Sequence, residues 1–176
     1  MNILFRVKNI SQDKAFLRKI IAITIPIALQ NFLNTTLNFI DTLMIGTLGE
    51  TTIAAVGLAN KVFFVFSLLL FGICSGSGVL TAQYWGKREM ENIKKVLGAS
   101  LILSLLASFF FAIPSMINPT GVMSILTNSN ESIRIGAIYL AIVALSYPFT
   151  SITNAYVTLL RGVNQVLIPV VISTIA

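Results

Sequence analysis

The stretch Gln30-Asn31-Phe32-Leu33-Asn34-Thr35-Thr36-Leu37-Asn38-Phe39-Ile40-Asp41 carries polar side chains through the middle of a long apolar run. Asn31, Asn34, Asn38 and Asp41 are spaced three, four and three residues apart, which places them on one face of a helix. The run around them, residues 20–45, corresponds to about 39 Å of helix, enough to cross a hydrocarbon core of about 30 Å. We therefore expect this polar face to lie inside a membrane.

Polar groups in hydrocarbon cost free energy unless they find partners or face water. The asparagines admit two interpretations: they hold neighbouring helices together by hydrogen bonds, or they line a polar cavity. An ionisable residue at this depth favours the functional interpretation. Asp41 is therefore the principal candidate for a functional site.

The composition indicates an all-α, polytopic membrane protein. Hydrophobic residues make up 56% of the 176 residues and charged residues only 10%, against roughly 25% charged in soluble domains. The net charge of +6 does not indicate nucleic-acid binding, because the basic residues sit in short segments between apolar runs. With no histidine, one cysteine and no paired carboxylates, the sequence predicts neither an enzyme nor a cofactor.

Four apolar runs are long enough to span the membrane, and we expect helices over residues 20–45, 53–84, 96–117 and 133–160. Pro26 and Pro148 should kink the first and fourth of these helices. Residues 86–95 and 118–132 are expected to be loops. A fifth apolar run begins at Val166 and reaches only about 16 Å as a helix, so we expect the chain to be truncated.

Basic residues are distributed unevenly between the predicted helices. Five precede the first helix, four lie in residues 86–95 and Arg161 follows the fourth helix, whereas only Arg134 lies at an expected outer end. Because basic segments stay on the cytoplasmic side, residues 1–19 are predicted to form a cytoplasmic segment and the N-terminus to be cytoplasmic.

Two features of the second predicted helix leave alternatives open. Lys61 is a basic residue well inside an apolar run, and it either extends to the membrane surface or faces a wet cleft, where it could pair with Asp41. Gly72, Gly76 and Gly78 form a cluster of small residues that serves either close helix packing or the thin wall of a cavity.

Several motifs resemble the opening of a transporter of the multidrug and toxic compound extrusion (MATE) family. They are Ile25-Pro26-Ile27-Ala28-Leu29-Gln30, Ile40-Asp41-Thr42-Leu43-Met44-Ile45-Gly46-Thr47-Leu48-Gly49, Ile53-Ala54-Ala55-Val56-Gly57-Leu58-Ala59-Asn60, Ala82-Gln83-Tyr84-Trp85-Gly86 and Leu160-Arg161-Gly162. The resemblance implies a twelve-helix protein of two lobes that exports organic cations and other drugs in exchange for Na⁺ or H⁺. Residues 20–176 would be part of its N-terminal lobe.

The resemblance also implies roles for single residues. The aspartate of the first helix belongs to the cation site in this family, and Asp41 is the matching position. We predict a cation- or proton-binding site at Asp41, Asn38 and Asn34, with no metal beyond Na⁺ at Asp41. The candidates for the substrate cavity are Gln30, Asn31, Asn60, Lys61 and Asn154. Lys61 departs from the family, which more often carries an uncharged residue there.

The resulting hypothesis is a cation-coupled antiporter of the cytoplasmic membrane that exports drugs or other organic cations. Its expected partners are these small molecules, the lipid bilayer and the remainder of the same transporter chain. One alternative is a flippase of the same superfamily for a lipid-linked sugar, whose cavity should carry several basic residues. The other is a small structural or regulatory membrane protein.

Overall fold

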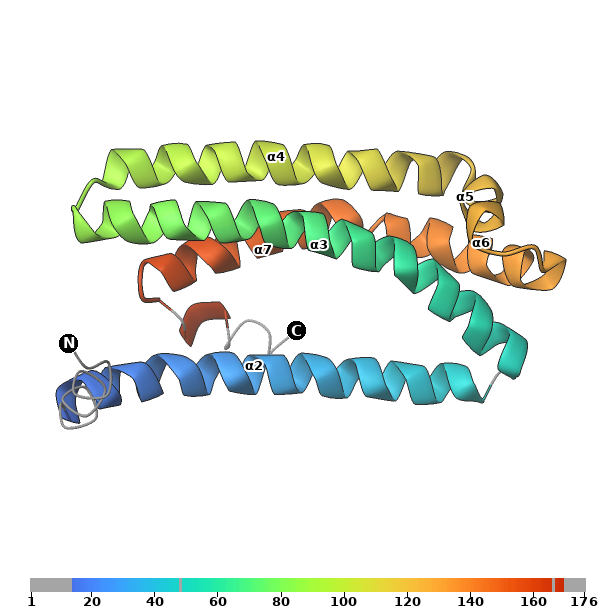
Figure 1. Cartoon of the computed structure of the whole chain (residues 1–176), viewed down its shortest axis with the longest axis horizontal. Coiled ribbons are helices and arrows are strands. Elements are labelled where there is room, and N and C mark those ends of the chain that lie inside the picture. Colours follow the sequence, from blue (N-terminus) through green and yellow to red (C-terminus); the bar gives the residue numbers. More distant parts are fainter. Residues whose placement is uncertain (1–13, 48, 166, 170–176) are drawn as a thin grey trace, which may run out of the picture.

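Apolar runs of this length satisfy their backbone polar groups within the lipid by forming helices. The computed structural model describes residues 14–47, 49–165 and 167–169, and within these ranges the regular structure is helical (Figure 1). The helices are α2 (Lys14–Gly46), α3 (Glu50–Gly86), α4 (Met90–Ile117), α5 (Pro119–Leu126), α6 (Asn130–Ala144) and α7 (Tyr147–Gly162). The predicted all-α class is confirmed.

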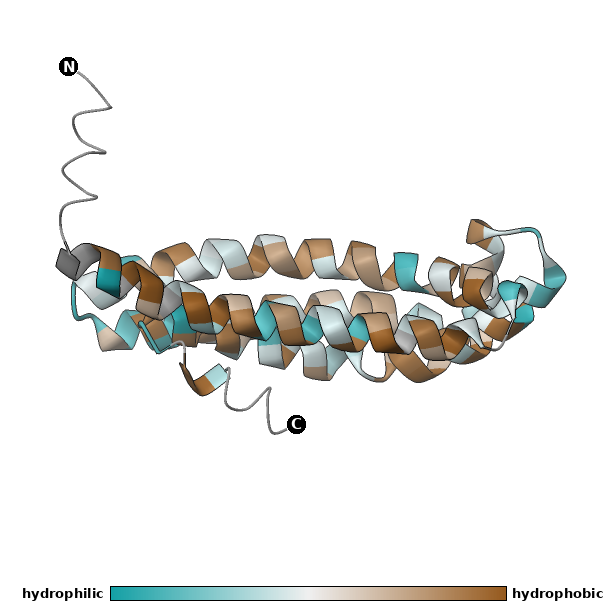
Figure 2. Cartoon of the chain, turned by 90° about the horizontal axis from the view of Figure 1, so that it is seen from below, coloured by the Kyte–Doolittle hydropathy of each residue, from teal (hydrophilic) through white to brown (hydrophobic). Residues whose placement is uncertain are grey.

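The long helices match the dimensions of a bilayer. Residues 20–46 of α2, all of α3 and all of α4 are long and apolar enough to cross a membrane, and α6 with α7 forms a further span with a break. Figure 2 shows mainly apolar residues along the helices, hydrophilic residues at the turns and a few hydrophilic bands within the helices. These helices are those of a multi-pass membrane protein.

Helices α3, α4, α6 and α7 pack against one another, and α2 lies beside this group, chiefly against α3 (Figure 1). One core cluster joins Phe66 and Leu70 of α3 to Ala112 of α4, Ala144 of α6 and Tyr147 of α7. The rings of Phe66 and Tyr147 stack with their centroids 4.8 Å apart, a contact worth roughly 0.5–1.5 kcal/mol beyond its buried area. This cluster holds together α3, α4, α6 and α7, the helices that support the site.

A line of small residues lets α4 approach its neighbours closely. Ser100, Ser104 and Ser108 recur every four residues and are all buried. The Ser151 hydroxyl of α7 donates a hydrogen bond of 3.0 Å to the Ser104 carbonyl oxygen. Small polar side chains at this spacing are typical of helix packing in membranes.

The fourth predicted helix is broken, as its proline predicts. α6 and α7 meet at residues 145–146 with a bend of 47°. Pro148 has no backbone N–H, so the carbonyl of Ala144 cannot receive the regular helical hydrogen bond from that position. At the break, the Ser146 hydroxyl donates a hydrogen bond of 2.7 Å to the carbonyl oxygen of Val143, the residue before Ala144. Pro26 has a smaller effect, since Figure 1 shows α2 as one nearly straight helix through that residue.

Some predicted boundaries differ from those in the structure. The differences occur where charged or turn-forming residues lie within a helix or at its start. The described part of α2 already includes Lys14 to Lys19, which the sequence assigned to the cytoplasmic segment, and residues 1–13 of that segment lie outside the described residues. The predicted loop 86–95 shrinks to residues 87–89, because α4 begins at Met90. The predicted loop 118–132 contains α5, which Asn118 caps by accepting a hydrogen bond of 2.9 Å from the Gly121 N–H.

Candidate functional site

A pocket of about 350 Å³ is lined on the α2 side by Asn38, Thr42 and Ile45. Its walls come from α2, α3, α6, α7 and the break between α6 and α7, and the lining residues are Asn38, Thr42, Ile45, Asn60, Phe63, Tyr139, Val143, Ser146 and Thr150. The Tyr139 hydroxyl donates to the Asn60 amide oxygen at 3.3 Å and so ties α6 to α3. We call this space the outer pocket, and the one described next the inner pocket, after the orientation that the basic residues predict.

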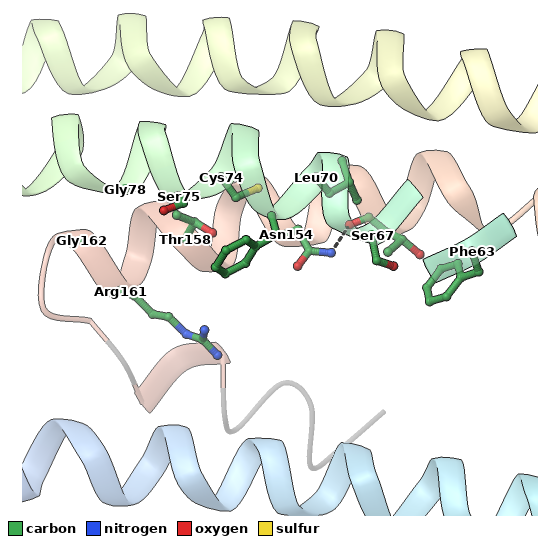
Figure 3. A pocket seen from close by; sticks show the side chains of 12 residues that line it. Phe63, Ser67, Leu70, Cys74, Ser75, Gly78, Asn154, Thr158, Arg161 and Gly162 are labelled. Carbon is green, nitrogen blue, oxygen red and sulfur yellow. Dashed lines mark hydrogen bonds between the residues drawn. The ribbon is translucent and has the colours of Figure 1, made fainter. Parts of the chain in front are cut away.

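A second pocket of about 540 Å³ lies between α3 and α7, on the side that faces α2 (Figure 3). Its lining residues are Phe63, Ser67, Leu70, Phe71, Cys74, Ser75, Gly78, Thr150, Asn154, Thr158, Arg161 and Gly162. The Asn154 amide donates to the Thr150 carbonyl oxygen at 2.9 Å, which leaves its amide oxygen available to the pocket. This inner pocket shares Phe63 and Thr150 with the outer pocket, and together the two form the central cavity.

The bend at residues 145–146 shapes this cavity. It brings Ser146 and Thr150 to the outer pocket while Asn154, Thr158 and Arg161 follow along α7 at helical spacing into the inner pocket. A straight helix would carry the second half of this span away from α3 or into it. The break that follows from Pro148 therefore sets where the polar residues of α7 lie.

Arg161 closes the inner end of the cavity. Its guanidinium Nη2 donates a hydrogen bond of 2.7 Å to the amide oxygen of Gln30 on α2, and Gln30 is buried at 6% exposure. The Nε of Arg161 is also buried and has no hydrogen-bond partner within the described part of the chain. In Figure 3 the Arg161 side chain extends from the end of α7 toward α2. This contact joins residues 131 positions apart in sequence.

The structure brings together part of the predicted site. Asn38 and Asn60 line the outer pocket, Asn154 lines the inner pocket, and Gln30 contacts the cavity through Arg161. Phe63 lines both pockets, which gives the cavity an aromatic surface at its centre.

The other predicted residues lie apart from these walls. Asn31, Asn34 and Lys61 are exposed and line neither pocket. For the asparagines the reason is that α2 packs chiefly against α3, which leaves much of its surface uncovered. Lys61 is directly next to Asn60 and so points to a different face of α3. Asp41 lies within α2, but its side chain is outside the described residues.

Arg161 was not among the predicted site residues, because at the sequence level it belongs to a short polar turn. Two signals could have identified it. It follows Asn154 by seven residues and so shares that helical face, and it ends a span whose polar residues cluster in one half. Its partner Gln30, however, is not predictable from local spacing.

Neutral side chains that donate and accept hydrogen bonds line the cavity around an aromatic centre. Amides and hydroxyls provide its polar surface, and Arg161 is the one charged residue among the lining side chains described above. Among the described residues there is no group of three or more His, Cys, Asp or Glu side chains that could hold a metal ion. The arrangement can bind an apolar or aromatic body and orient it by hydrogen bonds.

Known proteins with similar sequences include two that are named as probable multidrug resistance proteins and one that is named as a transporter. The chain is 28% identical to the probable multidrug resistance protein YoeA of Bacillus subtilis over 142 residues, which cover 80% of this chain and 31% of that protein. It is 30% identical to the probable multidrug resistance protein NorM of a Synechocystis species over 130 residues, or 72% of this chain and 27% of that protein. An uncharacterized transporter of Bacillus subtilis, YisQ, is 29% identical over 109 residues, or 58% of this chain and 24% of that protein.

The chain thus spans about a quarter to a third of the length of the curated relatives it matches. The family model MatE matches residues 26–176, which include the α2 polar face, the break between α6 and α7 and both pockets of the central cavity. The chain belongs to the MatE family, the multidrug and toxic compound extrusion family that its motifs resemble.

Proposed function

We propose that the chain contributes α2 to α7 to an antiporter, rather than an enzyme, that exports drugs or other organic cations in exchange for Na⁺ or H⁺. The observation that supports this most strongly is the central cavity, whose walls carry Asn38, Asn60 and Asn154 together with Phe63, which lines both pockets. The names of the multidrug resistance relatives support the same substrate class. We place the protein in the cytoplasmic membrane, with residues 87–89 on the cytoplasmic side because of their charge.

The proposed ion site is at Asp41, with Asn38 and Asn34 as neighbours on α2. Asn38 and Ile45 line the outer pocket, and helical spacing predicts that Asp41, between them, shares their face. A carboxylate in a low-dielectric cavity binds a proton more readily, and amide oxygens beside it could also ligate Na⁺. Either ion would remove most of the negative charge from this part of α2.

This change of charge couples ion binding to movement of α2. The helix packs less closely than α3, α4, α6 and α7, and Pro26 removes one of its backbone hydrogen bonds. Ion occupancy at Asp41 would bias α2 between two positions against α3, which is the two-state element that alternating access requires.

The cavity has an electrostatic direction that bears on the substrate. Arg161 lines the inner pocket, whereas the proposed ion site at Asp41 is on the part of α2 whose residues Asn38 and Ile45 line the outer pocket. A drug cation would therefore bind with its charge toward Asn38, Asn60 and Asp41, and with its apolar body against Phe63. Its release would be favoured when Na⁺ or H⁺ takes the place of its charge at Asp41.

Replacing Asp41 by Asn tests the proposal in the full-length transporter. The amide keeps the size of the side chain but can neither exchange a proton nor offer a full charge to Na⁺. Ion-driven accumulation of ethidium in everted vesicles, which reports export, should therefore fall to background. Glu50→Gln is the matched control, because Glu50 is an exposed acid at the start of α3. Coupled export by Asp41→Asn at the parental rate, at equal protein in the membrane, would remove Asp41 from the mechanism.

A flippase for a lipid-linked sugar is the second candidate, and Arg161 favours it. Its buried Nε, which has no hydrogen-bond partner among the described residues, could donate to a pyrophosphate oxygen. Lys61, the basic residue expected in such a cavity, is exposed and does not line it. In proteoliposomes, movement of a fluorescent lipid pyrophosphate that stops on Arg161→Gln, without ethidium transport, would decide for the flippase.

A further inference from the structure

A separate apolar groove follows the seam between α3 and α4. It has a volume of about 490 Å³, and its lining residues are Gly72, Ile73, Gly76, Ser77, Leu80, Tyr84, Asn92, Lys95, Val96, Ala99, Ser100 and Leu103. None of these residues lines the central cavity, and at 100° per residue the α3 members lie on the opposite face of that helix from the inner pocket. We call this feature the α3–α4 groove.

Two glycines make part of the groove open. A Cβ atom added to Gly72 or Gly76 would meet no atom within 4 Å, so neither glycine is required for contact with a neighbouring helix. Gly78 differs, because a Cβ there would lie 3.0 Å from the Thr158 side chain of α7. Glycine inside a helix costs roughly 1 kcal/mol relative to alanine. The cost at Gly72 and Gly76 is understandable if a slender apolar group occupies the space above them.

The end of the groove beside the 87–89 turn is polar and positively charged. Lys95, Tyr84 and Asn92 line it. The two nearby acids have other partners: Glu91 accepts from the Lys94 ammonium at 3.1 Å, and Glu89 accepts from the Asn92 amide at 2.6 Å.

Lys95 is left without a carboxylate partner in the part of the chain that the structure describes. Lys87 and Arg88 in the adjacent turn add to the positive charge. The mouth of the groove therefore attracts an anionic group.

The length of the groove matches one leaflet of a bilayer. From Gly72 to Tyr84 the α3 lining spans twelve residue steps, or about 18 Å. Half of a hydrocarbon core of about 30 Å is about 15 Å, so the groove runs from the membrane surface to near the midplane. An elongated apolar chain with an anionic head at the surface fits both ends of the groove.

We propose that the α3–α4 groove binds an anionic phospholipid from the leaflet that borders the 87–89 turn. One acyl chain lies over Gly72 and Gly76, and the phosphate lies at the Lys95 ammonium, with the Tyr84 hydroxyl as a further donor. The site is separate from the central cavity, with which it shares no lining residue.

Native mass spectrometry of the full-length protein, titrated in detergent with phosphatidylglycerol or with phosphatidylcholine of the same acyl chains, tests the charged end. Lys95→Gln should weaken phosphatidylglycerol binding about fivefold, the effect of one basic residue near an anionic head group, and leave phosphatidylcholine unchanged. Lys94→Gln is the matched control, because Lys94 is adjacent, pairs with Glu91 and does not line the groove. It should change binding less than twofold.

Gly76→Leu tests the apolar end, since its Cβ would meet no atom within 4 Å and the rest of the side chain would take up space in the groove. It should weaken both lipids, and a phosphatidylglycerol with a diazirine on its acyl chain should attach to residues 72–80 or 96–103 in the parent protein. Equal losses in Lys95→Gln and Lys94→Gln would reduce the effect to general surface charge and overturn the site. Phosphatidylglycerol binding that neither Lys95→Gln nor Gly76→Leu weakens would also overturn the site. This result is expected if another helix covers the groove.

Discussion

The hydrogen bond between Arg161 and Gln30 should hold α2 to the end of α7, and its strength can be measured by a double-mutant cycle. The perturbations are Gln30→Leu and Arg161→Met, which remove the polar groups while keeping side chains of similar length. The bond is short, at 2.7 Å, and one partner is charged. Gln30 is 6% exposed, so water competes little for its amide.

Two ranges bound the expected coupling energy. Neutral hydrogen bonds between membrane helices average about 0.6 kcal/mol and reach about 1.7 kcal/mol. Hydrogen bonds to charged groups contribute about 1.5–3 kcal/mol. The ranges overlap near 1.5 kcal/mol, which is our expected value and corresponds to a factor of about ten in the unfolding equilibrium.

The assay is reversible unfolding of the full-length protein in mixed micelles, followed by fluorescence, for the parent, both single variants and the double variant. The cycle subtracts the other contacts that each side chain loses, including those of Gln30 beyond this bond. A control cycle pairs Gln30→Leu with Lys94→Gln, where the effects should add. A coupling below about 0.5 kcal/mol between positions 30 and 161 equals the scatter of independent sites and would refute the reasoning.

Two further predictions concern packing and topology. Gly136→Ala should destabilise the protein by about 1–2 kcal/mol, because its Cβ would meet the fully buried Met123 side chain and lie 3.2 Å from the Ala55 carbonyl oxygen. In Gly57→Ala the added Cβ meets no atom within 4 Å, so this variant should be neutral or stabilising. Equal thermal shifts of the two variants would contradict this packing. In a cysteine-free background, Lys87→Cys and Asn128→Cys should react with an impermeant thiol reagent from opposite sides of the membrane. The reason is that basic residues surround position 87 but not position 128. Labelling of both positions from outside would reject the orientation.

Local rules predicted the spans well and their ends poorly. The break between α6 and α7 follows from Pro148, which removes a backbone donor wherever it occurs. The α5 helix was missed because Pro119 and Gly121 resemble a loop, although Asn118 followed by Pro119 is also a helix start. Whether such a segment forms a helix depends on whether the capping side chain reaches a backbone N–H of the first turn. The spacing of residues in the sequence does not reveal this.

The sequence by itself determined that this is a membrane protein, which helices cross the lipid and which face of α2 is polar, because hydropathy and helical periodicity are local properties. It also carried the motifs that show the family. Only the tertiary structure decided that Asn38, Asn60 and Asn154 line one cavity while Lys61 lies outside it. The contact of Gln30 with Arg161 was likewise invisible beforehand. Its partners are far apart in sequence, and they meet only because of how α2 and α7 are placed against α3.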